Sequence, residues 1–176
     1  MRHWIRLLQP DIYLGNSILA LTPEVIARQG LRGLIVDVDE TLVSMTDPDP
    51  AAEIRQWAEG VKADCQVVLL SNNVHHERIR RIAEALDVPF FTAAGKPSRR
   101  KLRQALALIN LPPETVAMVG DRLFTDVLAG NRLGLVTVLV DPVLELGQLN
   151  LKQILRSLEI WISARLGVTL QAVTGR

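Results

Sequence analysis

The chain has 176 residues, of which 48% are hydrophobic, so it can bury one sizeable core, and we expect a single domain over residues 1–176. Its 20 lysines and arginines nearly balance 19 aspartates and glutamates, which leaves no overall field to attract nucleic acid, and its single cysteine, Cys65, excludes an internal disulfide. No run of about 18 uncharged apolar residues predicts a membrane span, and the leader lacks the features of a secretory signal, so the sequence favours a cytoplasmic protein.

Strand-length apolar segments alternate with helical patterns along the chain. Thr22 and Pro23 predict the start of a short helix that ends at Gly30, and a buried strand at 33–36 follows it. Next come a helix at about 49–60, a strand at 66–71, a helix at 75–86 and a short strand around 89–91. A helix capped by Ser98, a strand at 116–120, a helix ending near Gly134 and a strand at 135–140 complete the pattern. Five strands with helical crossovers indicate an α/β protein with a doubly wound parallel five-stranded sheet.

Polar residues follow these strands at the points where the strands end. In an open doubly wound sheet, ligands bind beyond the carboxyl ends of the strands. The chain places there Asp37, Asp39, Ser71, Asn72, Lys96, Asp121 and Asp126. Crowded carboxylates repel one another unless a hard cation neutralises them, and oxygen ligands without His or Cys favour Mg²⁺. The sequence therefore predicts a magnesium site at this edge.

Two further features indicate an anionic substrate at the same edge. Lys96 adds a positive charge that the metal alone would not need. Ser71 and the amide groups after it precede a helix, where free N–H groups and the helix dipole favour phosphate. Each feature alone has a simpler interpretation: Asp121 as a helix cap, Lys96 as a solvated lysine, and the DVD block as a turn. Their joint placement favours phosphoryl transfer.

Four sequence blocks resemble the motifs of the haloacid dehalogenase superfamily. DVDETL is similar to the first motif, the serine of LLSNN to the second, Lys96 in GKP to the third, and GDRLFTD to the fourth. They occur in the expected order and span residues 33–126. The resemblance implies a phosphatase with the strand order 3-2-1-4-5, counted along the chain. A catalytic core at about 22–142 is expected.

The resemblance also implies roles for individual residues. Asp37 would be the nucleophile that forms an aspartyl-phosphate, and Asp39 would act as its acid and base partner. The residues expected at the substrate are Thr41, which would position the motif loop, and Ser71, Asn72 and Lys96. The expected magnesium ligands are the carboxylates of Asp37 and Asp121, the backbone carbonyl of Asp39, and Asp126, directly or through water.

Members of this superfamily commonly gain selectivity from a cap domain, and this chain has no room for a large one. About ten residues separate Asp39 from the next helix, and one helix and one short strand fill the stretch from Ser71 to Lys96. The N-terminal block, the SNN triplet and GDRLFTD resemble the YqeG group of class IIIA phosphatases, which is similar to mitochondrial phosphatidylglycerophosphate phosphatases. This resemblance implies a phosphomonoester substrate, namely a phospholipid. One departure is Glu40, where family members commonly have asparagine.

Without a large cap the site would be open to solvent, and two apolar segments leave undecided what covers it. The leader MRHWIRLL combines arginines with tryptophan and leucines, and a C-terminal amphipathic helix is expected at about 145–166. Either segment would lie on the inner face of a membrane, pack on the domain, or contact a second copy in a homo-oligomer. Two alternatives also remain open: a phosphatase of a soluble metabolite or phosphoprotein, and a binding module that keeps this fold without turnover.

Overall fold

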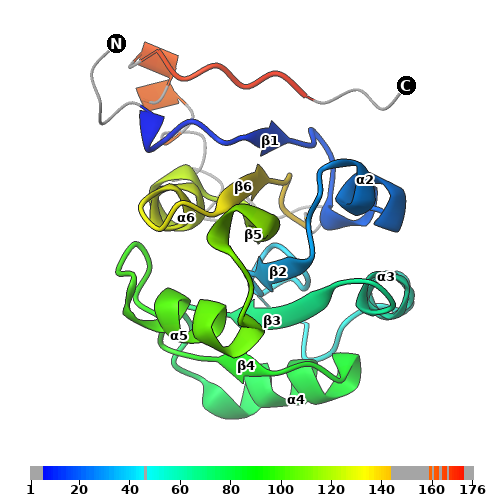
Figure 1. Ribbon diagram of the computed structural model, residues 1–176. Coiled ribbons are helices and arrows are strands. Elements are labelled where there is room, and N and C mark those ends of the chain that lie inside the picture. Colours follow the sequence, from blue (N-terminus) through cyan, green and yellow to red (C-terminus); the bar gives the residue numbers. More distant parts are fainter. Residues whose placement is uncertain are drawn as a thin grey trace.

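The sheet is built around one buried apolar strand (Figure 1). The computed structural model describes residues 6–45, 47–143, 159, 161–162, 164–165 and 167–172. Strand β2 (Gly33–Val36) pairs in parallel with β3 (Gln66–Leu70) on one side and with β5 (Val116–Gly120) on the other. All four residues of β2 are buried, as expected for a strand that is covered on both faces.

The described strands form a six-stranded sheet in the order β1-β6-β5-β2-β3-β4. The outer strands are β4 (Phe90–Phe91), β6 (Val136–Leu139) and β1 (Ile12–Tyr13), and every pairing is parallel. The predicted order 3-2-1-4-5 is confirmed for the five expected strands. The predicted number of strands was too low by one. Strand β1 is only two residues long, so it has no readable periodicity, and it forms by pairing with the distant β6.

Helices cover both faces of the sheet (Figure 1). They are α2 (Pro23–Arg28), α3 (Ala52–Lys62), α4 (His76–Leu86), α5 (Arg100–Ile109) and α6 (Leu128–Asn131), with short helical turns at η1 (Ile18–Ala20), η2 (Pro113–Thr115) and η3 (Leu123–Val127). Alternate residues of β2 point to opposite faces. Leu34 and Val36 pack in the cluster that includes α2, α3 and α4, whereas Ile35 packs in the cluster that includes α5 and α6. This alternation fixes the strand between two cores.

The start of α5 differs from the expectation. Ser98 was predicted to cap the helix, but the cap position is occupied by Arg99, and no side chain caps it. The amide of Ser98 donates to the carbonyl of Gly95 at 2.8 Å, so the preceding turn takes up this serine. Its hydroxyl lies 3.5 Å from the amide of Arg100, which is a long contact for a cap.

The apolar leader and the C-terminal helix lie mostly outside the described residues. The described part of the C-terminal region contains Trp161, which is exposed and stacks under the guanidinium of Arg165. Residues 167–172 run beside β1, where Ala172 forms a parallel bridge with Tyr13 (Figure 1). Within the described ranges, we find no helix with the length and apolarity needed to cross a membrane. The described loops after β2 and β3 contain no large cap domain.

Candidate active site

Of the eight predicted site residues, the carboxyl ends of the strands place five, all except Thr41, Ser71 and Asp126, around one small pocket. Its volume is about 60 Å³. The residues that line it are Asp37, Asp39, Glu40, Asn72, Lys96, Asp121, Arg122 and Thr125. Asp37 follows β2 and Asp121 follows β5, and these strands are neighbours in parallel register. The sheet topology therefore brings together side chains that are far apart in the sequence.

Asp37 is buried and lies against a positive charge. Its amide donates to the carbonyl of Val119, and its Oδ1 lies 2.5 Å from Lys96 Nζ. Burial raises the pKa of Asp37 from 3.8 to about 7; Lys96 opposes this shift, and the charge of Asp126 adds to it. A carboxylate in this environment gains from any further positive charge placed beside it.

Lys96 reaches the site from the loop after β4. Its ammonium lies 2.7 Å from Asp126 Oδ1 and donates to the carbonyl of Leu70 at 3.0 Å. Burial alone would lower the pKa of Lys96, but the charges of Asp126 and Asp37 raise it above its ordinary value. Lys96 therefore stays protonated at neutral pH, although its side chain is almost fully buried.

Asn72 holds the backbone of this lysine. Its Oδ1 accepts from the amide of Lys96 at 2.7 Å, and its Nδ2 donates to the carbonyl of Lys96 at 3.2 Å. The sequence predicted Asn72 at the substrate. The structure shows that its amide group bonds to Lys96 while the residue also lines the pocket. The two hydrogen bonds fix the loop that carries the ammonium.

Three buried carboxylates form a group with the dimensions of a metal site. Oxygen atoms of Asp37, Asp121 and Asp126 lie within 4.8 Å of one another. Asp126 comes from η3, a π-helical turn that contains the end of the fourth motif, and its Oδ2 accepts from the amide of Arg122 at 3.3 Å. Gly120 gives Asp126 room, because a Cβ at position 120 would lie 2.5 Å from Asp126 Oδ2. The backbone is therefore shaped around this carboxylate.

Asp39 is held by two hydrogen-bond donors, one of which sequence reasoning missed. Its Oδ2 accepts from Ser71 Oγ at 3.0 Å, and its Oδ1 accepts from Arg78 Nη1 at 2.6 Å. Ser71 is buried, and its hydroxyl oxygen accepts from the amide of Asn73 at 2.9 Å. In the sequence, Arg78 is one of three arginines on α4, and nothing separates it from Arg80 and Arg81.

Thr41 and Arg122 complete the surroundings of the site. Thr41 is fully buried, and within the described part of the chain its hydroxyl oxygen has no hydrogen-bond partner. Its predicted role in positioning the motif loop stays a prediction. The guanidinium of Arg122 pairs with the carboxylate of Glu159, so the described C-terminal region contacts the rim of the pocket.

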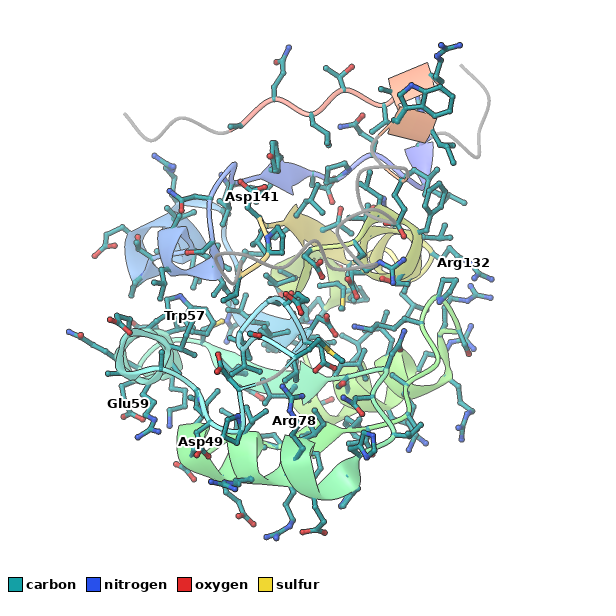
Figure 2. The ribbon with its side chains drawn as sticks, turned by 180° about the vertical axis from the view of Figure 1, so that it is seen from behind. Asp49, Trp57, Glu59, Arg78, Arg132 and Asp141 are labelled. Atoms are coloured by element: carbon teal, nitrogen blue, oxygen red, sulfur yellow. The ribbon has the colours of Figure 1, made fainter. Side chains whose placement is uncertain are left out.

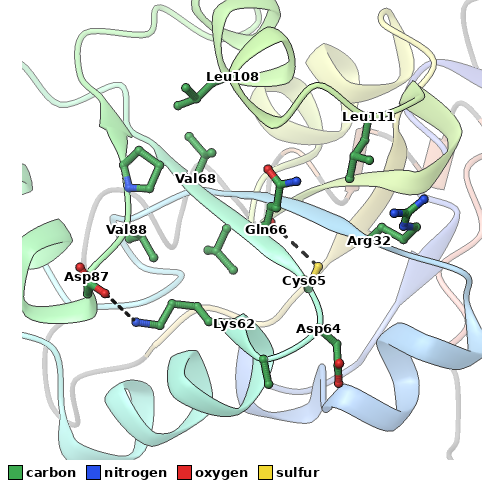
Figure 3. A pocket seen from close by; sticks show the side chains of 13 residues that line it. Arg32, Lys62, Asp64, Cys65, Gln66, Val68, Asp87, Val88, Leu108 and Leu111 are labelled. Atoms are coloured by element: carbon green, nitrogen blue, oxygen red, sulfur yellow. Dashed lines mark hydrogen bonds and ion pairs between the residues drawn. The ribbon is translucent and has the colours of Figure 1, made fainter.

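A hollow of about 640 Å³ lies at the amino-terminal ends of β2 and β3, away from the site at their carboxyl ends (Figure 3). It is lined by Cys65, which is buried, and by Lys62, which lies 3.6 Å from Asp87. Within the described residues, this hollow holds no group of acids like the one at the carboxyl edge. The chemistry of the chain is therefore concentrated at the small pocket rather than at the larger hollow.

The chain is similar to a known family and to named relatives. A HAD-hydrolase-like family model matches residues 93–142. The chain is 36% identical to the Bacillus subtilis protein named probable phosphatase YqeG over 135 residues, which are 76% of this chain and 77% of that protein. It is 27% identical to phosphatidylglycerophosphate phosphatase 1, chloroplastic, from Chlamydomonas reinhardtii over 162 residues, 78% of this chain and 59% of that protein.

The fold is also found in a solved structure. The crystal structure of a predicted HAD-like family hydrolase from Porphyromonas gingivalis has a TM-score of 0.51 at 16% identity and covers 73% of this chain and 98% of that one. The fold and these relatives thus define a haloacid dehalogenase-type phosphatase, a hydrolase of phosphate esters. The chain belongs to the haloacid dehalogenase superfamily and, within it, to the group of YqeG.

Proposed function

We propose that the chain hydrolyses phosphomonoesters in the presence of Mg²⁺, with Asp37 as the nucleophile. The observation that carries this proposal is the placement of buried Asp37 beside the ammonium of Lys96 and in one group with the carboxylates of Asp121 and Asp126. A buried nucleophile beside positive charge, at the edge of the sheet where ligands bind, suits an attack on an anionic phosphate.

The reaction would proceed in two steps on the residues of the chain. An oxygen of Asp37 forms a bond to phosphorus while the bond from phosphorus to the leaving oxygen breaks, and Asp39 gives that oxygen its proton. Asp39 then takes a proton from water, whose oxygen attacks phosphorus and releases Asp37 and inorganic phosphate. Ser71 and Lys96 would bind the phosphoryl oxygens, since their donors lie beside these two aspartates.

The residues present fit a magnesium ion. Asp37, Asp121 and Asp126 offer buried carboxylate oxygens within 4.8 Å of one another, and a lysine offsets only part of their charge. Asp37 and Asp121 would bind the ion together with the backbone carbonyl of Asp39, and Asp126 would bind it directly or through water. When bound, the ion would offset the negative charge of the phosphoryl group during transfer.

Replacement of the nucleophile tests the mechanism. Asp37→Asn should lower kcat by about 10³-fold or more, because the covalent route is lost. The control is Asp64→Asn, which changes an exposed aspartate at the other end of the sheet and should leave kcat unchanged. Mass spectrometry of the acid-quenched wild type should find a phosphoryl group on Asp37. Near-normal turnover of Asp37→Asn would exclude this mechanism.

For the substrate, we propose phosphatidylglycerophosphate or a related phospholipid monoester. The supports are the similarity to the chloroplastic phosphatidylglycerophosphate phosphatase and the described site, which carries no large cap that would enclose a small metabolite. With Mg²⁺, the protein should release phosphate from this lipid in mixed micelles much faster than from sugar or nucleotide phosphates. Equal or reversed rates would favour a soluble substrate, and no release from any phosphomonoester would favour a binding module.

A further inference from the structure

Arg78 reaches from α4 into the site and contacts three acceptors at once. Its Nη1 donates to Asp39 Oδ1 at 2.6 Å, and its Nη2 donates to the carbonyls of Ser44 at 2.8 Å and Asp47 at 3.2 Å. Figure 2 shows this side chain pointing from α4 toward the loop that follows β2. The side chain is 18% exposed, and that of Asp39 is 10% exposed. Arg78 therefore connects α4 with the loop that follows β2 and with the carboxylate of Asp39.

The neighbouring arginines of α4 make a different kind of contact. Arg80 pairs with Glu77 and Glu84 on its own helix, and Arg81 pairs with Asp49, at the exposed surface. Exposed pairs of this kind contribute little to stability. Arg78, in contrast, directs its guanidinium to the mostly buried carboxylate of Asp39 beside the nucleophile, where a fixed geometry matters.

The two oxygens of Asp39 are held by two donors on different elements. Ser71 Oγ binds Oδ2 from the end of β3, and Arg78 binds Oδ1 from α4. A carboxylate bound at both oxygens cannot rotate freely about its terminal torsion. An acid and base group must stay within hydrogen-bond reach of the proton it transfers, and small displacements lower the rate strongly.

We propose that Arg78 is a positioning residue that fixes the carboxylate of Asp39 for proton transfer to the leaving group. The inference rests on the proposed role of Asp39 as acid and base. The planar guanidinium can serve acceptors in different directions at once, whereas a lysine has a single nitrogen. Arg78 acts through Asp39, so its loss should slow the step in which Asp39 gives its proton.

The test compares two substrates that differ in their need for this proton. An alkyl phosphate releases a strongly basic alkoxide, whereas p-nitrophenyl phosphate releases a phenolate that leaves without protonation. Because kcat/KM reports the steps up to departure of the leaving group, Arg78→Met should lower kcat/KM for the alkyl phosphate by about 10- to 100-fold and for p-nitrophenyl phosphate by less than about threefold. Equal losses for both substrates would overturn the inference.

Two further variants separate positioning from folding. Arg80→Met removes an exposed arginine from the same helix and should leave both values of kcat/KM unchanged. Arg78→Lys keeps the positive charge and should recover only part of the loss for the alkyl phosphate. Urea unfolding of all variants shows whether each keeps the free energy of unfolding of the wild type. Full recovery with lysine would show that the charge suffices and would overturn the geometric role.

A double-mutant cycle distinguishes failure of this inference from failure of the proposed function. Asp39→Ala alone should lower the ratio of kcat/KM for the alkyl phosphate to kcat/KM for p-nitrophenyl phosphate. Adding Arg78→Met should lower this ratio no further, because both changes remove the same interaction. If Asp39→Ala leaves the ratio unchanged, the role of Asp39 in the proposed function fails. If Asp39→Ala lowers the ratio and Arg78→Met does not, only the role of Arg78 fails.

Discussion

The ammonium of Lys96 lies 2.5 Å from Oδ1 of Asp37, and both side chains are buried at the edge of the sheet. The same ammonium contacts Asp126, and Asp121 belongs to the same group. Three ionised carboxylates against one ammonium leave an excess charge of minus two. A divalent cation would neutralise that excess. The net charge of the site therefore fits Mg²⁺, and so do its carboxylate oxygens.

Removal of the lysine charge should destabilise the metal-free protein. Lys96→Met leaves Asp37 and Asp126 buried without their shared counter-charge, and such a change should lower the free energy of unfolding by about 3 kcal/mol. Urea unfolding in EDTA measures it. Lys101→Met is the control, because Lys101 lies over the ring of Phe91 near the surface. An equal decrease in the free energy of unfolding for both variants would show that the buried ion pairs of Lys96 stabilise the protein no more than the surface contact of Lys101 does.

The stability of the metal-free protein should depend on the ionisation of Asp37. Its pKa is about 7 in the folded state and 3.8 ordinarily, so the folded state binds more protons than the unfolded state between these pH values. This group therefore lowers the free energy of unfolding as the pH rises from about 4 to about 7.

The variant Asp37→Asn isolates this effect, because its side chain does not titrate. Relative to wild type, Asp37→Asn should gain stability as the pH rises through that window when unfolding is measured in EDTA. Saturating Mg²⁺ should remove the gain, since the ion binds the ionised carboxylate of the wild type. A difference that stays constant with pH would show that the pKa of Asp37 is not raised.

Substitutions at two glycines test metal binding and packing separately. A Cβ at position 120 would lie 2.5 Å from Asp126 Oδ2, and a Cβ at position 130 would lie 2.6 Å from the Cγ2 of Thr137. Gly120→Ala should therefore displace Asp126 and raise the Mg²⁺ concentration for half-maximal activity by about 10-fold or more. Gly130→Ala should lower the melting temperature without changing that concentration. The same metal requirement in both variants would exclude Asp126 from the metal site.

The sequence predicted the fold where local patterns decide it. Leu34, Ile35 and Val36 form an apolar run that only a strand covered on both faces can bury, and the structure has β2 there. Strand β1 was missed, because Ile12 becomes part of the sheet through its pairing with Val138. A contact so distant in the sequence leaves no local pattern.

The same distinction applies to the site. Asp37 and Asp121 follow predicted strands, and parallel strands end at one edge, so their proximity could be predicted from the topology. The contacts of Arg78 and Asn72 could not be predicted, because they depend on where a side chain points from its helix or loop. Asp126 joins the group of three carboxylates from a π-helical turn, and no sequence pattern distinguishes this turn from an ordinary helix.

Glu40 occupies a backbone conformation that suits asparagine better. Its φ angle is 63°, in the left-handed region, where asparagine is tolerated better than longer side chains. Glu40→Asn should therefore raise the free energy of unfolding by roughly 0.5 kcal/mol. This gain is smaller than the backbone strain of the left-handed conformation, because the contact of Glu40 Oε1 with the amide of Met45 is lost.

The matched control is Glu40→Gln, which removes the same charge, keeps the side-chain length and has no preference for this conformation. It should not raise the stability, so a gain with both variants would assign the effect to charge rather than to the backbone. Urea unfolding in EDTA compares the three proteins without a contribution from metal binding. Because position 40 lines the pocket but lies outside the proposed catalytic pair of Asp37 and Asp39, kcat for p-nitrophenyl phosphate should change by less than about threefold in Glu40→Asn.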